Sequence, residues 1–120
     1  INLPSLYAMP WVERDAAVSR AGLIINASAA GMHGRPDLNI DLTDAQDSAL
    51  AYDLVYTPEE TGFLKLAATR GLTVLGGLDM LIAQARPSFK LFFGQTPPPE
   101  LDPSDAVRAA LIDAARFSQD

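Results

Sequence analysis

The chain has 120 residues, enough for one domain, and its hydrophobic fraction of 48% predicts a packed core rather than disorder. Its net charge of −6 disfavours a surface for nucleic acids or anionic membranes, because such a surface needs a basic face. The absence of cysteine excludes disulfides and thiolate metal sites.

The sequence carries no sign of membrane insertion or export. No apolar run approaches the roughly 20 residues of a membrane span, and no basic-then-apolar leader opens the chain. We therefore expect no membrane contact and a cytoplasmic location. The first residue is Ile1 rather than methionine, so we also expect the chain to be a piece of a longer protein.

The first part of the chain predicts one short helix, one strand and a long loop. Two prolines make residues 1–10 irregular, and a helix is expected over Trp11 to Arg20. The continuously apolar run Leu23 to Asn26 is typical of a parallel strand buried on both faces. A small-residue loop follows it, and His33 to Asp47 is expected to be a surface loop, with at most a helical turn near Leu42 to Gln46.

The middle of the chain predicts a second strand over Ala49 to Tyr56 and then a helix. Asp53 lies inside this apolar strand, where a carboxylate is costly unless it is paired or hydrogen-bonded. We expect it to cap a nearby loop or helix through backbone N–H groups, and the alternative is a catalytic role. The next helix is expected to start at Thr57, with Glu60 completing a capping box, and to run to Arg70.

The last part predicts a third strand, a diglycine turn and a long helix. The strand covers Leu72 to Leu75, and Gly76-Gly77 leads into a helix over Leu78 to Phe93, which Pro87 should kink. A proline-rich connector and a last amphipathic helix over about 102–117 complete the chain. The apolar side chains of the long helix are expected to pack inward: Leu78, Leu81, Ile82, Ala85, Phe89 and Phe92.

Strands that alternate with helices predict an α/β fold built from parallel βαβ units. Ligands of such sheets bind at the carboxyl ends of the strands. Residues Asn26 to Ser28, Tyr56 and Gly76-Gly77 are all expected at that edge, which makes it the candidate site.

The start of the long helix adds to this candidate site. A glycine there lets a ligand approach free backbone N–H groups at the positive end of the helix dipole. Gly77, Met80 and Gln84 follow at i, i+3 and i+7, on one helical stripe. The alternative is a plain turn, followed by a core methionine and a surface glutamine.

Three blocks in order resemble shikimate dehydrogenase, in the second half of its cofactor domain. They are Ile24 to Ser28 with Gly31-Met32, Tyr52 to Tyr56 with Pro58 to Thr61, and Gly76 to Leu81 with Gln84-Ala85. The resemblance implies a partial Rossmann-like parallel sheet of about three strands flanked by helices, with C-terminal helices. Residues 1–95 would be the C-terminal half of an NADP-binding domain, and residues 96–120 its connector and last helix.

The resemblance also implies an activity and its residues. The family reduces 3-dehydroshikimate to shikimate with NADPH, in chorismate biosynthesis. Tyr56 and Gln84 match substrate-binding positions. The matching cofactor positions are Leu54, Gly77 and Met80 at the nicotinamide end, and Asn26, Ala27 and Ser28 under the pyrophosphate and ribose. The sequence departs from the family pattern at Ser28, Asp79 and Arg86-Pro87.

The family's Lys–Asp proton-transfer pair belongs to an N-terminal catalytic domain, which this sequence does not contain. We therefore expect no catalytic residue in this fragment, no activity of the chain alone, and that missing domain as its partner. Lys65 and Lys90 are interpreted as surface residues, His33 is given no role, and no metal site is expected. A homodimer is compatible with the sequence. Three alternatives stay open: quinate or a related substrate, NAD in place of NADP, and a non-catalytic binding module.

Overall fold

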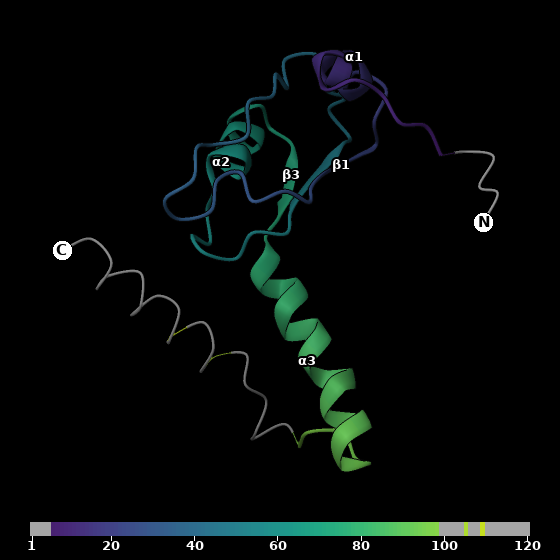
Figure 1. The fold of residues 1–120 in the computed structure, drawn as a ribbon, viewed down its shortest axis with the longest axis vertical. Helices are drawn as coiled ribbons and strands as arrows, with labels where there is room; N and C mark the ends of the chain where they lie inside the picture. Colours follow the sequence, from purple (N-terminus) through teal and green to yellow (C-terminus); the bar gives the residue numbers. More distant parts are fainter. Residues whose placement is uncertain (1–5, 99–104, 106–108, 110–120) are drawn as a thin grey trace.

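The computed structural model describes residues 6–98, 105 and 109. The elements in chain order are η1 (Trp11–Glu13), α1 (Arg14–Val18), β1 (Leu23–Asn26), β2 (Leu50–Asp53), α2 (Gly62–Thr69), β3 (Thr73–Leu75) and α3 (Gly77–Phe93). Figure 1 shows β1 and β3 beside α2, with α1 at one end of the sheet and α3 running away from the other.

The three strands form one parallel sheet in the order β1-β2-β3. Leu23 of β1 pairs with Leu50 of β2, which pairs in turn with Thr73 of β3. Strands β2 and β3 are joined through α2 in a βαβ unit, as the alternation of elements predicts, whereas β1 and β2 are joined by a loop. The expected three-stranded parallel sheet is confirmed, and the strand over Leu23 to Asn26 is confirmed to the residue.

The core lies on one face of the sheet, under α2 and the loop that precedes β2. Ile24 and Ala51 point into it from the strands, and Phe63, 1% exposed, fills it from α2. Burying a side chain of this size contributes about 1.5–3 kcal/mol to the free energy of unfolding. The full cluster is Val18, Ile24, Leu42, Ala45, Ala49, Ala51, Phe63, Leu64, Ala67 and Leu72.

The opposite face of the sheet is open. Leu23 and Ile25 of β1 are 51% and 49% exposed, and Leu75 of β3 is 36% exposed. The expectation that β1 is buried on both faces is therefore wrong. Side chains alternate along a strand, and α2 and the loop before β2 pack against only one side.

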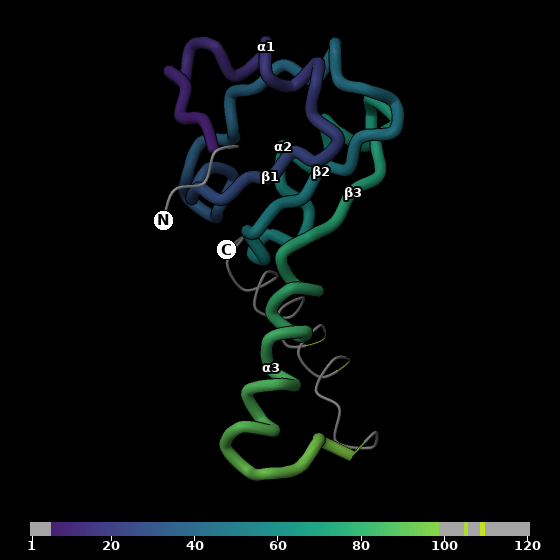
Figure 2. Tube along the Cα trace, turned by 90° about the vertical axis from the view of Figure 1, so that its right-hand side faces the viewer, coloured from purple at the N-terminus to yellow at the C-terminus, as the bar shows by residue number. Residues whose placement is uncertain are grey.

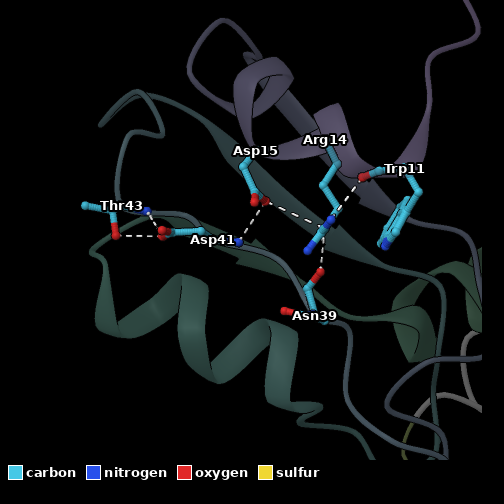
Figure 3. A network of polar contacts seen from close by, with 6 residues as sticks. All are labelled: Trp11, Arg14, Asp15, Asn39, Asp41 and Thr43. Carbon is cyan, nitrogen blue, oxygen red and sulfur yellow. Dashed lines mark hydrogen bonds and ion pairs between the residues drawn. The ribbon is translucent and has the colours of Figure 1, made fainter.

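The loop between β1 and β2 is partly a core element. Leu42 and Ala45 are buried, although this stretch was expected to be a surface loop. Figure 3 shows how polar contacts hold it to α1. Arg14 Nε donates to the Asn39 carbonyl (2.6 Å), and the Asp41 N–H donates to the Asp15 carboxylate (3.1 Å). These contacts leave the apolar residues of the loop facing the sheet.

A second arginine holds the same loop from the other side. Arg70, which caps the C-terminus of α2, donates to the carbonyls of Thr43 (3.1 Å) and Ala45 (2.9 Å). It also pairs with Asp47 at 2.9 Å. The loop is thus attached to both helices that flank it.

The start of α2 differs from the prediction. The helix begins at Gly62, and its cap is Thr61, whose hydroxyl accepts from the Leu64 N–H at 3.3 Å. Thr57 was expected to cap, and this is wrong. The second strand also ends at Asp53 rather than at Tyr56, because the Asp53 carboxylate takes the Val55 N–H and ends the regular ladder.

Helix α3 leaves the sheet after little more than one turn, as Figures 1 and 2 both show. Leu78 and Ile82 are buried, which confirms the inward packing of the first turns. Leu91 and Phe92 are 86% and 82% exposed, so inward packing of the distal half is wrong. Gly94, at φ +70°, ends the helix in the left-handed conformation that favours glycine.

Two further expectations concern the C-terminal part. Pro87 lies within α3, and the kink expected there stays a prediction. The last helix, expected over about 102–117, lies outside the described residues except for Asp105 and Ala109, which are helical. No helix in the part of the chain that the structure describes is long and apolar enough to cross a membrane.

Candidate functional site

The segments after β1 and β2 lie against each other at the carboxyl ends of the strands. The Leu54 N–H donates to the Asn26 carbonyl at 3.0 Å, so the two backbones remain side by side just past the sheet. A cleft of 180 Å³ opens between them. Its lining residues are Ala27, Ser28, Met32, Leu54, Val55, Tyr56 and Thr57.

The cleft brings together half of the residues predicted for the site. Ala27, Ser28, Leu54 and Tyr56 line it, although they come from two segments far apart in the sequence. Tyr56 is 42% exposed, so its phenol is accessible to solvent. The cleft thus offers a hydroxyl, a phenol and an apolar wall to a ligand.

Asn26 holds the first wall of the cleft, which is the loop after β1, in place through its side chain. It is buried, and its side-chain oxygen accepts from both the N–H (3.1 Å) and the hydroxyl (2.7 Å) of Ser28. Its side-chain nitrogen donates to the Ala30 carbonyl at 3.0 Å. The loop after β1 is therefore closed around one amide group, which fixes where the Ser28 side chain lies.

Asp53 organises the second wall. Its side chain is 0% exposed, and its Oδ1 accepts from Asn26 Nδ2 (3.1 Å) and from the Val55 N–H (2.9 Å). Its Oδ2 accepts from the Thr61 hydroxyl (2.5 Å). The expected capping role is confirmed. The partners Asn26 and Thr61 were missed, and no local signal could have found them, because they are distant in sequence.

Gly77 lies behind the cleft, against Leu54 and Val55. A Cβ at Gly77 would stand 2.4 Å from the Leu54 carbonyl oxygen and 2.7 Å from the Val55 oxygen. Glycine is therefore required by the close packing of α3 on the segment after β2. The Gly77 N–H donates to the Val55 carbonyl at 3.3 Å. The expectation that the backbone N–H groups at this turn are free for a ligand is therefore wrong at Gly77.

Met80 and Gln84 do not line the cleft. Met80 is half-buried and Gln84 is exposed on α3, one and two turns beyond the glycine. The predicted stripe of Gly77, Met80 and Gln84 lies on a helix that leads away from the sheet (Figure 1). Their predicted contacts with cofactor and substrate stay predictions.

The acidic groups of the described residues gather at no metal site. Within residues 6–98, 105 and 109, no three His, Asp or Glu side chains gather to hold a metal ion. The Thr43 hydroxyl, and then the Thr43 N–H, lower the pKa of Asp41 below its usual value by donating to its carboxylate at 2.6 and 2.8 Å (Figure 3). This pair lies in the loop before β2, away from the cleft.

Comparison with known proteins shows what this chain is similar to. The model of the shikimate 5'-dehydrogenase C-terminal domain matches residues 77–102. Shikimate dehydrogenase (NADP(+)) from Sphingopyxis alaskensis is 50% identical over 101 residues, which cover 84% of this chain and 36% of that protein. This chain is similar to the C-terminal part of shikimate dehydrogenases. The counterpart from Maricaulis maris is 44% identical over 98 residues and shows the same partial coverage, 35% of its length.

Solved structures place the fold in the same family. Shikimate 5-dehydrogenase from Thermus thermophilus, in complex with NADP(H) and shikimate, superposes with a TM-score of 0.72 at 32% identity, covering 88% of this chain and 38% of that one. Quinate dehydrogenase from Corynebacterium glutamicum, in complex with NAD, gives 0.68 at 30% identity, covering 78% and 33%. The sheet is thus a partial Rossmann-like sheet, and the chain spans about a third of the length of the shikimate dehydrogenases that it matches.

Proposed function

We propose that this chain is the C-terminal part of an NADP-dependent shikimate dehydrogenase, which reduces 3-dehydroshikimate to shikimate. The observation that carries the proposal is the cleft at the carboxyl ends of β1 and β2. There the loop after one strand and the phenol after the next meet, which is where Rossmann-like sheets bind their ligands. The 50% identity to a shikimate dehydrogenase supports the same assignment.

In this proposal the first wall of the cleft holds the pyrophosphate and ribose of NADP. Asn26 keeps the loop of Ala27 and Ser28 closed by accepting from the Ser28 hydroxyl and N–H. The hydroxyl would turn from Asn26 to donate to a phosphate oxygen. When bound, the nicotinamide of NADPH would supply the hydride. Leu54, Gly77 and Met80 would line that end of the cofactor and exclude water from the hydride path.

The substrate contacts in the proposal are Tyr56 and Gln84. Their hydroxyl and amide groups are donors and acceptors suited to the hydroxyls of a cyclohexene acid. Tyr56 lines the cleft and is accessible. Gln84 is exposed on α3, so its contact depends on a substrate that reaches from the cleft to that helix.

We also propose that the chain works beside an N-terminal catalytic domain that supplies the Lys–Asp pair. Residues 1–95 would be the second half of the cofactor domain, and residues 96–120 its connector and last helix. Strand β1 forms an edge of the sheet, and its Leu23 and Ile25 are half-exposed. A groove of 390 Å³ between α1 and β1 is mostly apolar. An edge and an apolar face of this kind suit a neighbouring strand and helix.

The test compares two purified proteins, the 120-residue chain and the full-length protein encoded by the natural reading frame. With shikimate and NADP, we expect turnover by the full-length protein and none by the chain alone. A full-length protein that does not turn over shikimate would overturn the assigned reaction. Full activity of the 120-residue chain would overturn the need for a catalytic domain.

A second candidate is quinate oxidation with NAD, favoured by the similarity to quinate dehydrogenase at 30% identity and a TM-score of 0.68. The ratio kcat/KM for shikimate over quinate, measured with each nucleotide on the full-length protein, separates the two. We expect the larger value for shikimate with NADP. A larger value for quinate with NAD would reverse the assignment.

The proposed enzyme would be cytoplasmic, and a homodimer is compatible with it. Cell fractionation with an antibody against the chain tests the first point, with recovery in the membrane or exported fraction as the contrary result. Sedimentation equilibrium of the full-length protein tests the second, by measuring the mass of the assembled particle.

A further inference from the structure

The Asp53 carboxylate joins three segments that are separate in the sequence. Through Oδ1 it holds Asn26 at the end of β1 and the Val55 N–H after β2. Through Oδ2 it holds Thr61, the cap of α2. It is fully buried and does not line the cleft, so it contacts the candidate site only through its hydrogen-bond partners.

The route from Asp53 to the cleft passes through one amide. Asn26 donates to Asp53 with its nitrogen and accepts both Ser28 donors with its oxygen, so the carboxylate fixes the orientation of that amide. The Val55 N–H holds the residue between Leu54 and Tyr56. The carboxylate therefore links both walls of the cleft, in addition to the backbone bond from the Leu54 N–H to the Asn26 carbonyl.

The chemistry of these partners explains why a carboxylate stands here. Three donors converge on Asp53, namely an amide nitrogen, a backbone N–H and a hydroxyl, and an ionised carboxylate only accepts. Asparagine at position 53 would keep one side-chain oxygen, which could accept from Asn26 Nδ2 and the Val55 N–H as Oδ1 does. Its nitrogen would face Thr61, whose hydroxyl can turn and accept. Alanine would leave the buried donors of Val55 and Thr61 without a partner.

We propose that Asp53 is a positioning residue for the cofactor site, which fixes Ser28 and Tyr56 across the cleft before any ligand binds. The proposal rests on the function proposed above. A preformed site avoids the loss of loop entropy on binding, so the effect of Asp53 falls on cofactor binding as well as on stability.

The test uses Asp53→Ala, Asp53→Asn and Thr61→Val in the full-length protein, with NADP KM, kcat and the exchange rates of the Ser28 and Ala30 amides as readouts. Thr61→Val is the control, because it removes the bond at Oδ2, together with the cap of α2, and leaves both bonds at Oδ1. We expect Asp53→Ala to raise the KM for NADP roughly ten- to a hundredfold, the scale of an ångström-sized misplacement. Asp53→Asn should stay within about threefold of wild type, because it keeps an acceptor at Oδ1.

Amide exchange gives a readout that needs no activity. Asp53→Ala should speed exchange at Ser28 and Ala30 at least about tenfold, the result of a locally opened loop, and Thr61→Val should leave both rates unchanged. Should Asp53→Ala prove too unstable to purify, Asn26→Leu breaks the same link from its other end and should give the same two effects.

The outcomes separate this inference from the proposed function. A wild-type protein without shikimate turnover overturns the function, and amide exchange then decides the role of Asp53. Equal KM and equal exchange rates in Asp53→Ala and Thr61→Val overturn the positioning role and leave only a stabilising one.

Discussion

The two faces of the same sheet differ sharply in what covers them. On one face, Ile24 and Ala51 are buried under α2 and the loop before β2, together with the polar pair Asn26 and Asp53. On the other face, Leu23 and Ile25 are half-exposed in the same strand. Neighbouring side chains of one apolar run thus have opposite environments, because they alternate across the sheet.

This difference shows that the run Leu23 to Ile25 carries more apolar surface than the described residues cover. Contiguous exposed apolar residues on a sheet face are a mark of an interaction surface. The polar network is found only on the covered face, where Asn26 and Asp53 satisfy each other. The covered face therefore builds the candidate site, and the open face is an apolar surface that the described residues leave uncovered. The predictions below test this contrast in the full-length protein.

The largest effect is expected from truncating a core phenylalanine. Phe63→Ala should reduce the free energy of unfolding by about 3–5 kcal/mol, because it leaves a cavity under the sheet. The control is Phe92→Ala at the exposed end of α3, for which a change within about 0.5 kcal/mol is expected. Urea denaturation measures both. A large loss from Phe92→Ala would show that α3 is covered in the full-length protein.

The next effect compares adjacent isoleucines on the two faces. Ile24→Ala should cost about 2–3 kcal/mol, at the lower end for such a truncation because the side chain is at the border of burial. Ile25→Ala should cost under about 1 kcal/mol by the exposure seen here. Equal losses at the two positions would contradict an exposed Ile25 and would mean that another part of the full-length protein buries the open face.

A smaller effect is expected where α3 starts. Gly77→Ala should cost about 1–3 kcal/mol, since its Cβ would overlap the backbone of Leu54 and Val55. It should also raise the KM for NADP, because Leu54 lines the cleft. Gly76→Ala is the matched control, with its nearest contact at an ordinary 3.6 Å. Thermal unfolding and steady-state kinetics measure the pair, and equal behaviour would contradict the packing argument.

The smallest effect is expected from the hydrogen bonds between Thr43 and Asp41, in the loop before β2. The Thr43 hydroxyl and N–H lower the pKa of Asp41 below its ordinary value of 3.8. These two hydrogen bonds therefore stabilise the folded state above pH 3.8. The stabilisation is lost as the pH falls through the pKa of the folded state. Thr43→Val should raise this pKa, and Thr43→Ser should keep it lowered. Carbon-detected NMR titration measures both variants. No change in Thr43→Val would contradict the hydroxyl as the main cause.

Several features could be predicted because their signals are local. The apolar run Leu23 to Asn26 predicted β1 with its bounds, and the diglycine predicted the start of α3. The cost of a buried carboxylate was enough to predict a capping role for Asp53. The site positions Ala27, Ser28, Leu54 and Tyr56 followed from strand ends and family resemblance, and the structure brings them to one cleft.

Other features could not be predicted, because they depend on distant partners. The sequence predicted Thr57 as the cap of α2, but the cap is Thr61, whose hydroxyl also donates to Asp53, eight residues earlier. The periodicity of α3 predicts one apolar face along its whole length, but the sheet is long enough to cover only its first turns. Nothing in the neighbourhood of Leu42 indicated that its loop would supply the core.

The sequence by itself determined the order of strands and helices, the parallel topology and the family, because these follow from short patterns and from ordered blocks of residues. Only the tertiary structure decided which face of the sheet is buried, why Gly77 must be glycine, and how Asn26 and Asp53 form one network across 27 positions. Burial and hydrogen bonding between distant segments depend on how the strands align in space, and no local pattern encodes that alignment.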